Sequence, residues 1–241
     1  MIYEEYVKAS LEDYGRNGKL EERAILRVLE DIASYHSDSV GYGVRNIQKS
    51  KLVWLLLEWR LKIHIPMNYG ESYRVTTWSR GVCSPCTTLR DFQIFDEEGN
   101  LCVSASSKWT PVNYEDKKIL RVTDELLSLY GTENNSAFED GELFRLREPK
   151  EYLYEMPYRI CRKEIDLNGH LHNLCYLDIA LETIPESVYH ARDFREIRIT
   201  YRKEIRADEK DIICKYREEN DVHTVGIYGP DGKLRAMVAL S

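Results

Sequence analysis

The chain contains 241 residues, of which 43% are hydrophobic and 31% are charged, and its formal net charge is −7. These proportions are typical of a soluble globular protein with one large domain or two small ones. No run of 18 uncharged apolar residues occurs, so we expect no membrane span, and the negative charge argues against nucleic acid as the general partner. The first residues, MIYEEYVKASLEDYG, lack the basic and apolar regions of a signal peptide, and the six cysteines are scattered. A reducing, cytoplasmic location is therefore expected.

The first half of the chain reads as a strand, a polar turn, a helix and then several strands. Apolar residues at helical spacing predict the helix; they are Leu20, Ala24, Ile25, Val28, Ile32 and Tyr35. Stretches rich in β-branched and aromatic residues predict the strands; they cover residues 55–65, 72–78, 87–95 and 101–109. Residues 122–142 then contain a short helical piece followed by acidic, polar and glycine residues, which is typical of a linker.

The second half follows the same order of elements. Its helix is predicted from apolar residues at helical spacing, and Pro185 should end that helix; the residues are Tyr176, Leu177, Ala180, Leu181 and Ile184. The predicted strands cover residues 195–201, 210–217 and 223–229. Each half is therefore expected to pack one long helix against a mainly antiparallel sheet, an α+β architecture.

An internal repeat relates the two halves. Residues 58–78 align without a gap with residues 196–216, so that Glu58 meets Glu196. Residues 95–106 align with residues 228–239, and in both a glycine turn precedes an apolar strand. The repeat predicts two domains.

These observations set the expected boundaries. The N-terminal domain should cover residues 1–122, a linker residues 123–150, and the C-terminal domain residues 151–241.

A polar cluster precedes the second predicted helix, in the stretch IDLNGHLHNLCYLDIALE that begins at Ile165. An imidazole titrates near neutrality, a carboxylate can act as base or nucleophile, and a helix N-terminus offers N–H groups to an oxyanion. We interpret the cluster as a candidate active site. Structural alternatives exist for its members: turn residues (Asp166, Asn168), a hydrogen-bonded structural histidine (His170), a solvent or helix-start residue (His172), a helix cap (Asn173) and a packing residue (Tyr176).

Several separated motifs resemble, in order and spacing, those of the acyl-acyl carrier protein thioesterase family. They are Asp166-x-Asn168-x-His170-x-x-Asn173-x-x-Tyr176, Tyr201-Arg-Lys-Glu204, Thr88-Leu-Arg-Asp91 and the stretch WLLLEWRLKIHIPMNYGESYRVTTW. The resemblance covers nearly the whole chain and implies a tandem double hot-dog fold. It also implies a hydrolase without a cofactor, which cuts the thioester between a fatty acyl chain and the phosphopantetheine arm of acyl carrier protein during fatty acid biosynthesis.

The resemblance further implies a catalytic set of Asp166, Asn168, His170 and Glu204. Asp166 would orient a neighbour, Asn168 would orient substrate or water, and His170 would share the proton transfers. Glu204 would activate water or act as nucleophile, whereas by itself a Glu among Arg and Lys reads as a surface ion pair. Many family members carry a cysteine directly after this Glu; here Ile205 excludes a cysteine nucleophile at that position.

The two halves are not expected to be chemically equal. Aligned on Asp166, the first half offers Asp13, Gly15 and Asn17 without a histidine, and Pro66 occupies the position of Glu204. One active site per chain follows. The resemblance implies that the interior of the first half holds the acyl chain, where four tryptophans are candidate wall residues or plain core residues: Trp54, Trp59, Trp78 and Trp109.

Two other motifs carry less weight. Cys83-Ser-Pro-Cys86 has redox-motif spacing, but a strand rather than a helix should follow it, and nothing completes a zinc site. A run of cations is either a solvated strand face or a docking surface for an acidic partner: Arg195, Arg198, Arg202, Lys203 and Arg206.

Two rival functions remain at this point, an acyl-CoA thioesterase on the same scaffold and a non-catalytic acyl-binding protein. A homodimer is compatible with the sequence, which does not determine the acyl chain length or saturation.

Overall fold

The computed structural model describes residues 1–140, 143–191 and 193–241. The chain divides into two compact units, unit 1 (residues 1–143) and unit 2 (residues 144–241). The division falls inside the segment predicted as a linker, of which residues 141 and 142 lie outside the described residues.

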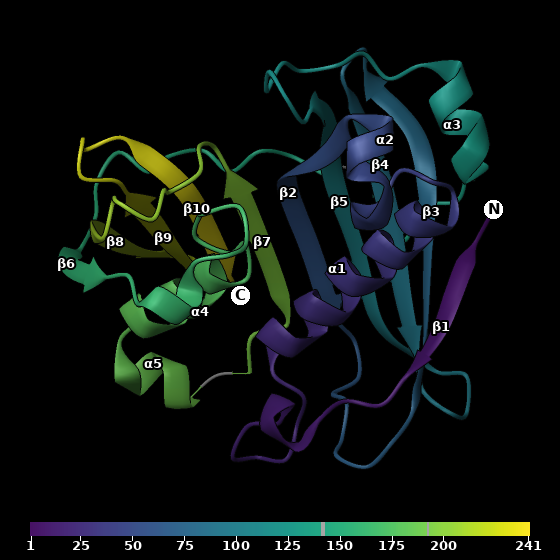
Figure 1. Cartoon of the computed structure of the whole chain (residues 1–241). Coiled ribbons are helices and arrows are strands. Elements are labelled where there is room, and N and C mark those ends of the chain that lie inside the picture. The colour runs from purple at the N-terminus through teal and green to yellow at the C-terminus, as the bar shows by residue number, and fades with distance from the viewer. Residues whose placement is uncertain (141–142, 192) are drawn as a thin grey trace. The chain divides into compact units, whose positions relative to one another are not determined.

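Unit 1 places one long helix beside a five-stranded antiparallel sheet (Figure 1). Its strands are β1 (Tyr3–Val7), β2 (Leu52–Ile63), β3 (Tyr73–Ser84), β4 (Thr87–Phe95) and β5 (Leu101–Asn113). Its helices are α1 (Glu22–Ser39), α2 (Ile47–Ser50) and α3 (Asp124–Tyr130), with 3₁₀ turns at Leu11–Asp13 and Val44–Asn46. The strand order is β1-β3-β4-β5-β2, and each hydrogen-bonded pair is antiparallel.

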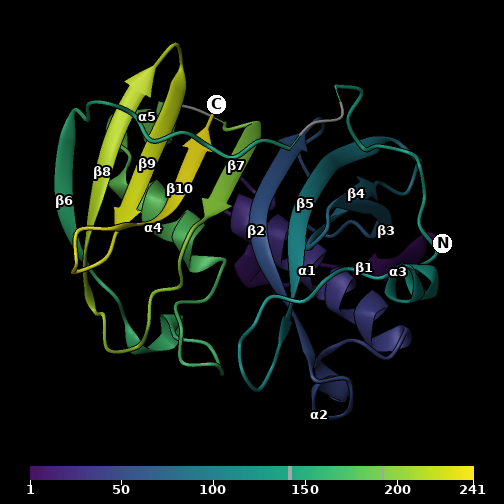
Figure 2. The same cartoon turned by 90° about the horizontal axis from the view of Figure 1, so that it is seen from above.

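Unit 2 repeats this plan with shorter elements, and its helix α4 lies against one face of its own sheet (Figure 2). The strands are β6 (Tyr154–Arg159), β7 (Glu196–Tyr201), β8 (Asp211–Glu219), β9 (Val222–Tyr228) and β10 (Leu234–Leu240). The helices are α4 (Cys175–Thr183) and α5 (Glu186–Ala191), with a 3₁₀ turn at Arg162–Glu164. The order β7-β10-β9-β8-β6 corresponds to the order of unit 1 read from β2 to β1.

The helices follow the sequence pattern with two differences. A long helix was expected in each half, but α4 has only 9 residues where α1 has 18, because Pro185 ends it as predicted. The predicted apolar stripe of α1 included Tyr35, which is 50% exposed; His36 is buried in its place. The His36 ring is satisfied in this buried position because it accepts a hydrogen bond from Arg90 of β4 and stacks on Tyr3 of β1.

The two faces of the unit 1 sheet are covered differently. On the inner face, which packs against α1, lie fully buried side chains such as Val75, Phe92 and Ile94. The outer face is crossed by residues 132–140, which we call the outer strap. The Trp78 indole donates to the Asn135 carbonyl at 2.8 Å.

Two further contacts hold the outer strap. Buried Asp91 accepts the Ala137 N–H at 2.7 Å, and Arg60 forms a two-point ion pair with Asp140 at 2.6 and 3.0 Å. This part of the predicted linker is therefore packed on unit 1.

The four tryptophans are divided between these faces. The registers place Trp54, Trp59 and Trp109 on the inner face, where Trp59 contacts Phe92 with ring centroids 5.1 Å apart. Trp78 lies on the outer face, opposite Asp91. A role of the first three in lining an acyl site stays a prediction, and Trp78 cannot share that inner surface. Among the described residues, no helix has the length and apolar character needed to cross a membrane.

Candidate functional site

His170 lies in a tight turn of unit 2 between the 3₁₀ turn and α4. The turn is closed by a bridge between Ile165 and Leu171, in which Asp166 donates its N–H to the His170 carbonyl at 2.8 Å. Gly169 has a φ of +78°, a left-handed conformation that glycine adopts without a steric penalty. The backbone therefore fixes where the His170 side chain starts.

Glu204 comes from a separate segment, the loop that follows β7. We call residues 202–209 the Glu204 loop. Its middle is tied to the histidine turn by three contacts: Leu171 donates to the Ile205 carbonyl at 2.8 Å, Ala207 donates to the Gly169 carbonyl at 2.9 Å, and His170 forms a bridge with Arg206. Ile205 is fully buried and anchors the loop.

These two segments bring an imidazole and a carboxylate together. Nε2 of His170 lies 3.4 Å from Oε1 of Glu204, and the side chains are 32% and 53% exposed, respectively. Both groups therefore meet water and can reach a substrate. A partly exposed base paired with a carboxylate can accept a proton from water and pass it to a leaving group.

The other two predicted site residues hold the turn. Oδ1 of Asp166 accepts the N–H groups of Asn168 at 2.8 Å and of His170 at 3.0 Å. Asn168 is exposed, and its amide lies 3.5 Å from Oδ2 of Asp166. Among the described residues, neither side chain forms a hydrogen bond or ion pair with the His170 ring or the Glu204 carboxylate. Asp166 thus orients His170 through its backbone.

The start of α4 differs from the sequence-based expectation. The helix begins at Cys175 with Leu174 as its N-cap and without a side-chain cap. The prediction that Asn173 caps this helix is therefore wrong. Backbone hydrogen bonds to the carbonyls of residues 172–174 already use the N–H groups of Cys175, Tyr176 and Leu177. The expectation that this helix start presents free N–H groups to an oxyanion is wrong for these three residues. His172 does take a helix-start role, because its Nδ1 accepts the Leu174 N–H at 3.3 Å.

The corresponding turn of unit 1 corrects the predicted alignment. A bridge between Tyr14 and Leu20 matches the one between Ile165 and Leu171. Gly18, with a φ of +72°, therefore corresponds to Gly169. The counterparts of Asp166, Asn168 and His170 are thus Gly15, Asn17 and Lys19, two residues beyond Asp13, Gly15 and Asn17.

The prediction that this turn of unit 1 has no histidine is confirmed, because Lys19 is the counterpart of His170. Leu20 donates to the Met67 carbonyl as Leu171 does to Ile205. This contact fixes Pro66 as the counterpart of Glu204, as the sequence alignment predicted. The shared Asn-Gly pair of the two turns is the signal that would have given the correct alignment.

Comparison with known families gives the assignment. The family model described as "Acyl-ACP thioesterase N-terminal domain" matches residues 1–130, and the one described as "Acyl-ACP thioesterase C-terminal domain" matches residues 147–228. The chain belongs to the acyl-ACP thioesterase family.

Similar proteins support the same family. "Oleoyl-acyl carrier protein thioesterase 2, chloroplastic" of Arabidopsis thaliana is 24% identical over 204 residues, which cover 77% of this chain and 54% of that protein. The oleoyl-acyl carrier protein thioesterase of Coriandrum sativum is 22% identical and the match covers 98% of this chain and 68% of that protein. The chain spans little more than half the length of the first of these relatives.

Solved structures confirm the tandem hot-dog fold of the family. The 12:0-ACP thioesterase from Umbellularia californica has a TM-score of 0.86 at 18% identity, covering 100% of this chain and 96% of that one. An acyl-ACP thioesterase from Bacteroides thetaiotaomicron has a TM-score of 0.84, also at 18% identity, covering 99% and 96%. The predicted α+β architecture is therefore correct.

In this member of the family, neither the position after Glu204 nor the cysteine nearest along the chain to His170 presents an exposed thiol. The residue after Glu204 is Ile205, as the sequence showed. Cys175, the nearest cysteine along the chain to His170, is 3% exposed and its Sγ lies 3.9 Å from the Glu164 carbonyl. Cys83 lies in the last part of β3 and Cys86 in the turn before β4, so a strand follows them as predicted.

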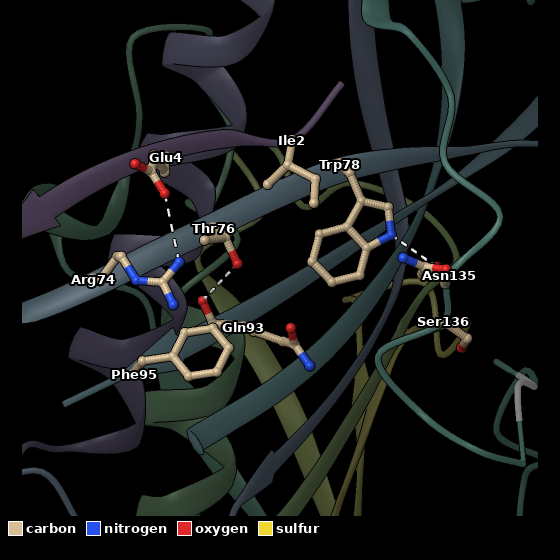
Figure 3. Close-up of a pocket in the computed structure, with 9 residues that line it drawn as sticks. All are labelled: Ile2, Glu4, Arg74, Thr76, Trp78, Gln93, Phe95, Asn135 and Ser136. Atoms are coloured by element: carbon tan, nitrogen blue, oxygen red, sulfur yellow. Dashed lines mark hydrogen bonds and ion pairs between the residues drawn. The ribbon is translucent and has the colours of Figure 1, made fainter. Parts of the chain in front are cut away.

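Unit 1 has a pocket of about 430 Å³ on the outer face of its sheet (Figure 3). Trp78 and Phe95 form apolar walls, and the outer strap borders it at Asn135 and Ser136. Among the described residues that line it, the titratable side chains are Arg74 and Glu4, which pair with each other at 3.5 Å. This pocket therefore lacks the acid-base groups that the His170 site has.

Two residues of the site were not assigned a site role from the sequence. The Tyr176 hydroxyl, expected only to pack, accepts the Ile205 N–H at 3.2 Å and so holds the Glu204 loop. Burial raises the pKa of this hydroxyl. The Tyr201 hydroxyl donates to the Asn173 carbonyl at 3.1 Å. Both tyrosines belong to motifs of the resemblance, which was the available signal.

Proposed function

We propose that this chain hydrolyses the thioester of fatty acyl-acyl carrier protein and releases free fatty acid and carrier protein in fatty acid biosynthesis. The observation that carries the proposal is the pairing of His170 Nε2 and Glu204 Oε1 at 3.4 Å. The models of both domains of the family match this chain, which supports it. Unit 1 has Lys19 and Pro66 at these positions, so the chemistry belongs to unit 2.

In the proposed reaction, Glu204 and His170 handle the protons of hydrolysis. Water attacks the thioester carbonyl while Glu204 accepts its proton, and the C–S bond then breaks. The proton passes through His170 to the departing thiolate of the carrier's arm, so the groups return to their starting state. A nucleophilic role for Glu204, with water entering in a second step, remains an alternative within this proposal. Asn168, exposed beside the turn, would orient the substrate or the water.

Other features support the setting that we propose. Among the described residues, none of the six cysteines forms a disulfide, which supports a reducing, cytoplasmic location, although the curated relatives are named chloroplastic. The partner is acyl carrier protein with its fatty acyl-phosphopantetheine. The exposed cations Arg202, Lys203 and Arg206 of the Glu204 loop are suited to an acidic partner.

A substrate panel tests this function against its rivals. Purified protein is given matched acyl-carrier and acyl-CoA thioesters of several chain lengths, and free fatty acid is measured. We expect faster hydrolysis of the carrier-protein thioesters. Preference for the CoA thioesters would favour an acyl-CoA thioesterase. Tight acyl binding without fatty acid release would favour a non-catalytic acyl-binding protein.

Two substitutions test the proposed roles. His170→Ala and Glu204→Gln should each lower turnover by about 100-fold or more, since a general acid-base group typically supplies 10²–10⁴. Glu204→Gln should leave the protein folded, because an exposed ion pair contributes at most about 1 kcal/mol. A folded Glu204→Gln variant with parental turnover would remove Glu204 from the mechanism.

A further inference from the structure

A buried arginine lies next to the Glu204 loop. Arg235 of β10 is 1% exposed, and its Nη2 lies 2.5 Å from Oε1 of Glu209 and 2.9 Å from Oδ1 of Asp231. A buried guanidinium is costly unless carboxylates pair with it, and removal of one partner leaves an uncompensated charge. The position of Glu209 is therefore strongly coupled to Arg235.

Arg235 contacts both ends of the Glu204 loop. Its carbonyl accepts the N–H groups of Arg202 at 2.8 Å and of Lys203 at 3.1 Å, directly before Glu204. Its guanidinium holds Glu209, whose Oε2 accepts the Arg206 N–H at 3.0 Å. Glu204 lies between these two attachments.

The corresponding loop of unit 1 is built without such an arginine. Cys102 stands at the position of Arg235, and its carbonyl accepts the N–H groups of His64 at 2.8 Å and Ile65 at 3.2 Å. Glu71, the counterpart of Glu209, is instead bound by the Tyr73 hydroxyl. The same backbone turn thus forms without a guanidinium, so the fold alone does not require one.

A second difference makes room for the arginine. A Cβ on Gly229 would lie 2.5 Å from Nη2 and 2.6 Å from Cζ of Arg235. The aligned residue of unit 1 is Asp96, which has a side chain there. Two coordinated changes, an arginine and a glycine, therefore occur in the unit that carries His170 and Glu204.

We propose that Arg235, acting through Glu209, is a positioning residue that holds the Glu204 loop so that the Glu204 carboxylate stays next to His170. This inference rests on the proposed function, in which Glu204 takes part in hydrolysis. An error of about 1 Å in a reacting group costs on the order of 100-fold in rate. Loss of the guanidinium should therefore act on turnover more than on substrate binding.

The test compares two buried, ion-paired arginines. Arg235→Met removes the guanidinium and keeps an unbranched apolar side chain, and Arg60→Met makes the same change at the Arg60–Asp140 pair of unit 1. The measurements are kcat and KM for acyl-carrier thioesters, thermal unfolding, and amide hydrogen exchange of residues 202–207. Residues 64–69, the counterpart in unit 1, serve as the internal reference.

We expect Arg235→Met to lower kcat at least about tenfold with KM within about threefold, and to speed exchange in residues 202–207 about tenfold or more. Residues 64–69 should exchange as in the parent. Arg235→Lys should keep more of the parental kcat than Arg235→Met does. Arg60→Met should leave kcat and the exchange of residues 202–207 unchanged. Glu209→Gln, which keeps the size of the side chain, should give the same pattern and replaces Arg235→Met if that variant does not fold.

Two results would overturn the inference. One is parental kcat and loop exchange in folded Arg235→Met or Glu209→Gln. The other is faster exchange everywhere, which would mean a purely structural role. If the parent hydrolyses thioesters and Glu204→Gln does not, either result leaves the proposed function standing. A parent without any hydrolysis would refute the proposed function, and loop exchange would still decide whether Arg235 orders the loop.

Discussion

The histidine turn shows how single residues set the geometry of the candidate site. Asp166 supplies one carboxylate oxygen to two backbone N–H groups, those of Asn168 and His170. This pattern is the Asx turn, in which a short side chain replaces a backbone acceptor. Unit 1 solves the same problem with Asn17, whose Oδ1 accepts the Lys19 N–H at 3.0 Å. A neutral amide oxygen is therefore sufficient for the turn.

The charge of Asp166 should consequently matter little. Asp166→Asn keeps an acceptor oxygen, and we expect turnover within about fivefold of the parent, because the net difference between such hydrogen bonds is about 1 kcal/mol. Asp166→Ala removes the acceptor and should cost about tenfold or more for the same reason. Steady-state kinetics on both variants separate the roles. A loss of about 100-fold in Asp166→Asn alone would show that the carboxylate takes part in the chemistry.

At this scale the sequence predicted which residues belong to the turn, but not what they contact. His170 and Glu204 were named through the family resemblance, and the structure brings them within 3.4 Å. Asp166 and Asn168 were expected in the same chemical set, which stays a prediction, whereas in the structure Asp166 contacts backbone N–H groups and the Asn168 amide contacts Asp166. The difference arises because a motif records residue types, while hydrogen-bond partners depend on φ and ψ at positions such as Gly169.

Among the elements, α1 contains an unusual acid. Burial raises the pKa of the Glu30 carboxyl to about 8, and the Trp59 indole and the Arg23 charge oppose this only in part. Neither Oε1 of Glu30 nor Nε1 of Trp59 has a hydrogen bond that meets normal geometry among the described residues. We therefore expect the Glu30 carboxyl to keep its proton at neutral pH.

This acid predicts a pH-dependent stability. Above a pH of about 4.5, the unfolded chain loses the Glu30 proton while the folded chain keeps it until about 8, so the free energy of unfolding falls across this interval. Glu30→Gln cannot ionise and should lack this fall. We expect the variant to gain at least about 1.4 kcal/mol relative to the parent between pH 5 and pH 8, the equivalent of one pKa unit.

Urea unfolding of parent and variant at the two pH values measures this gain. Comparison with the parent also removes the contribution of His36. Burial lowers the pKa of His36 to about 3, so its contribution to the free energy of unfolding rises with pH up to about 6.5 and is the same in both proteins. An equal change in the two proteins would show that Glu30 ionises normally.

The helix itself was predictable from its apolar spacing, but a Glu on its buried side was not, since only tertiary packing determines which faces are covered.

Across the whole molecule, one plan is built twice and only one copy carries the chemical groups. The ungapped repeat predicted both sheets, because strands must keep their register to bury the same face. It failed at the turns before the helices, where α4 is half as long as α1 and the alignment needs a different offset. An alignment anchored on acidic residues therefore slipped by two positions.

The corrected alignment gives a direct test of one site per chain. Lys19 and Pro66 occupy the positions of His170 and Glu204, so this turn offers neither an imidazole nor a carboxylate at these two positions. We expect the double variant Lys19→Ala, Pro66→Ala to keep turnover within about threefold of the parent, as for surface changes away from a site. The matching change in unit 2, His170→Ala with Glu204→Gln, should reduce hydrolysis to background. Thermal unfolding shows whether each variant is folded. If the unit 1 variant is folded and its turnover falls tenfold or more, then this turn takes part in the reaction too. In that case the chain does not have the single active site in unit 2 that the missing histidine implies.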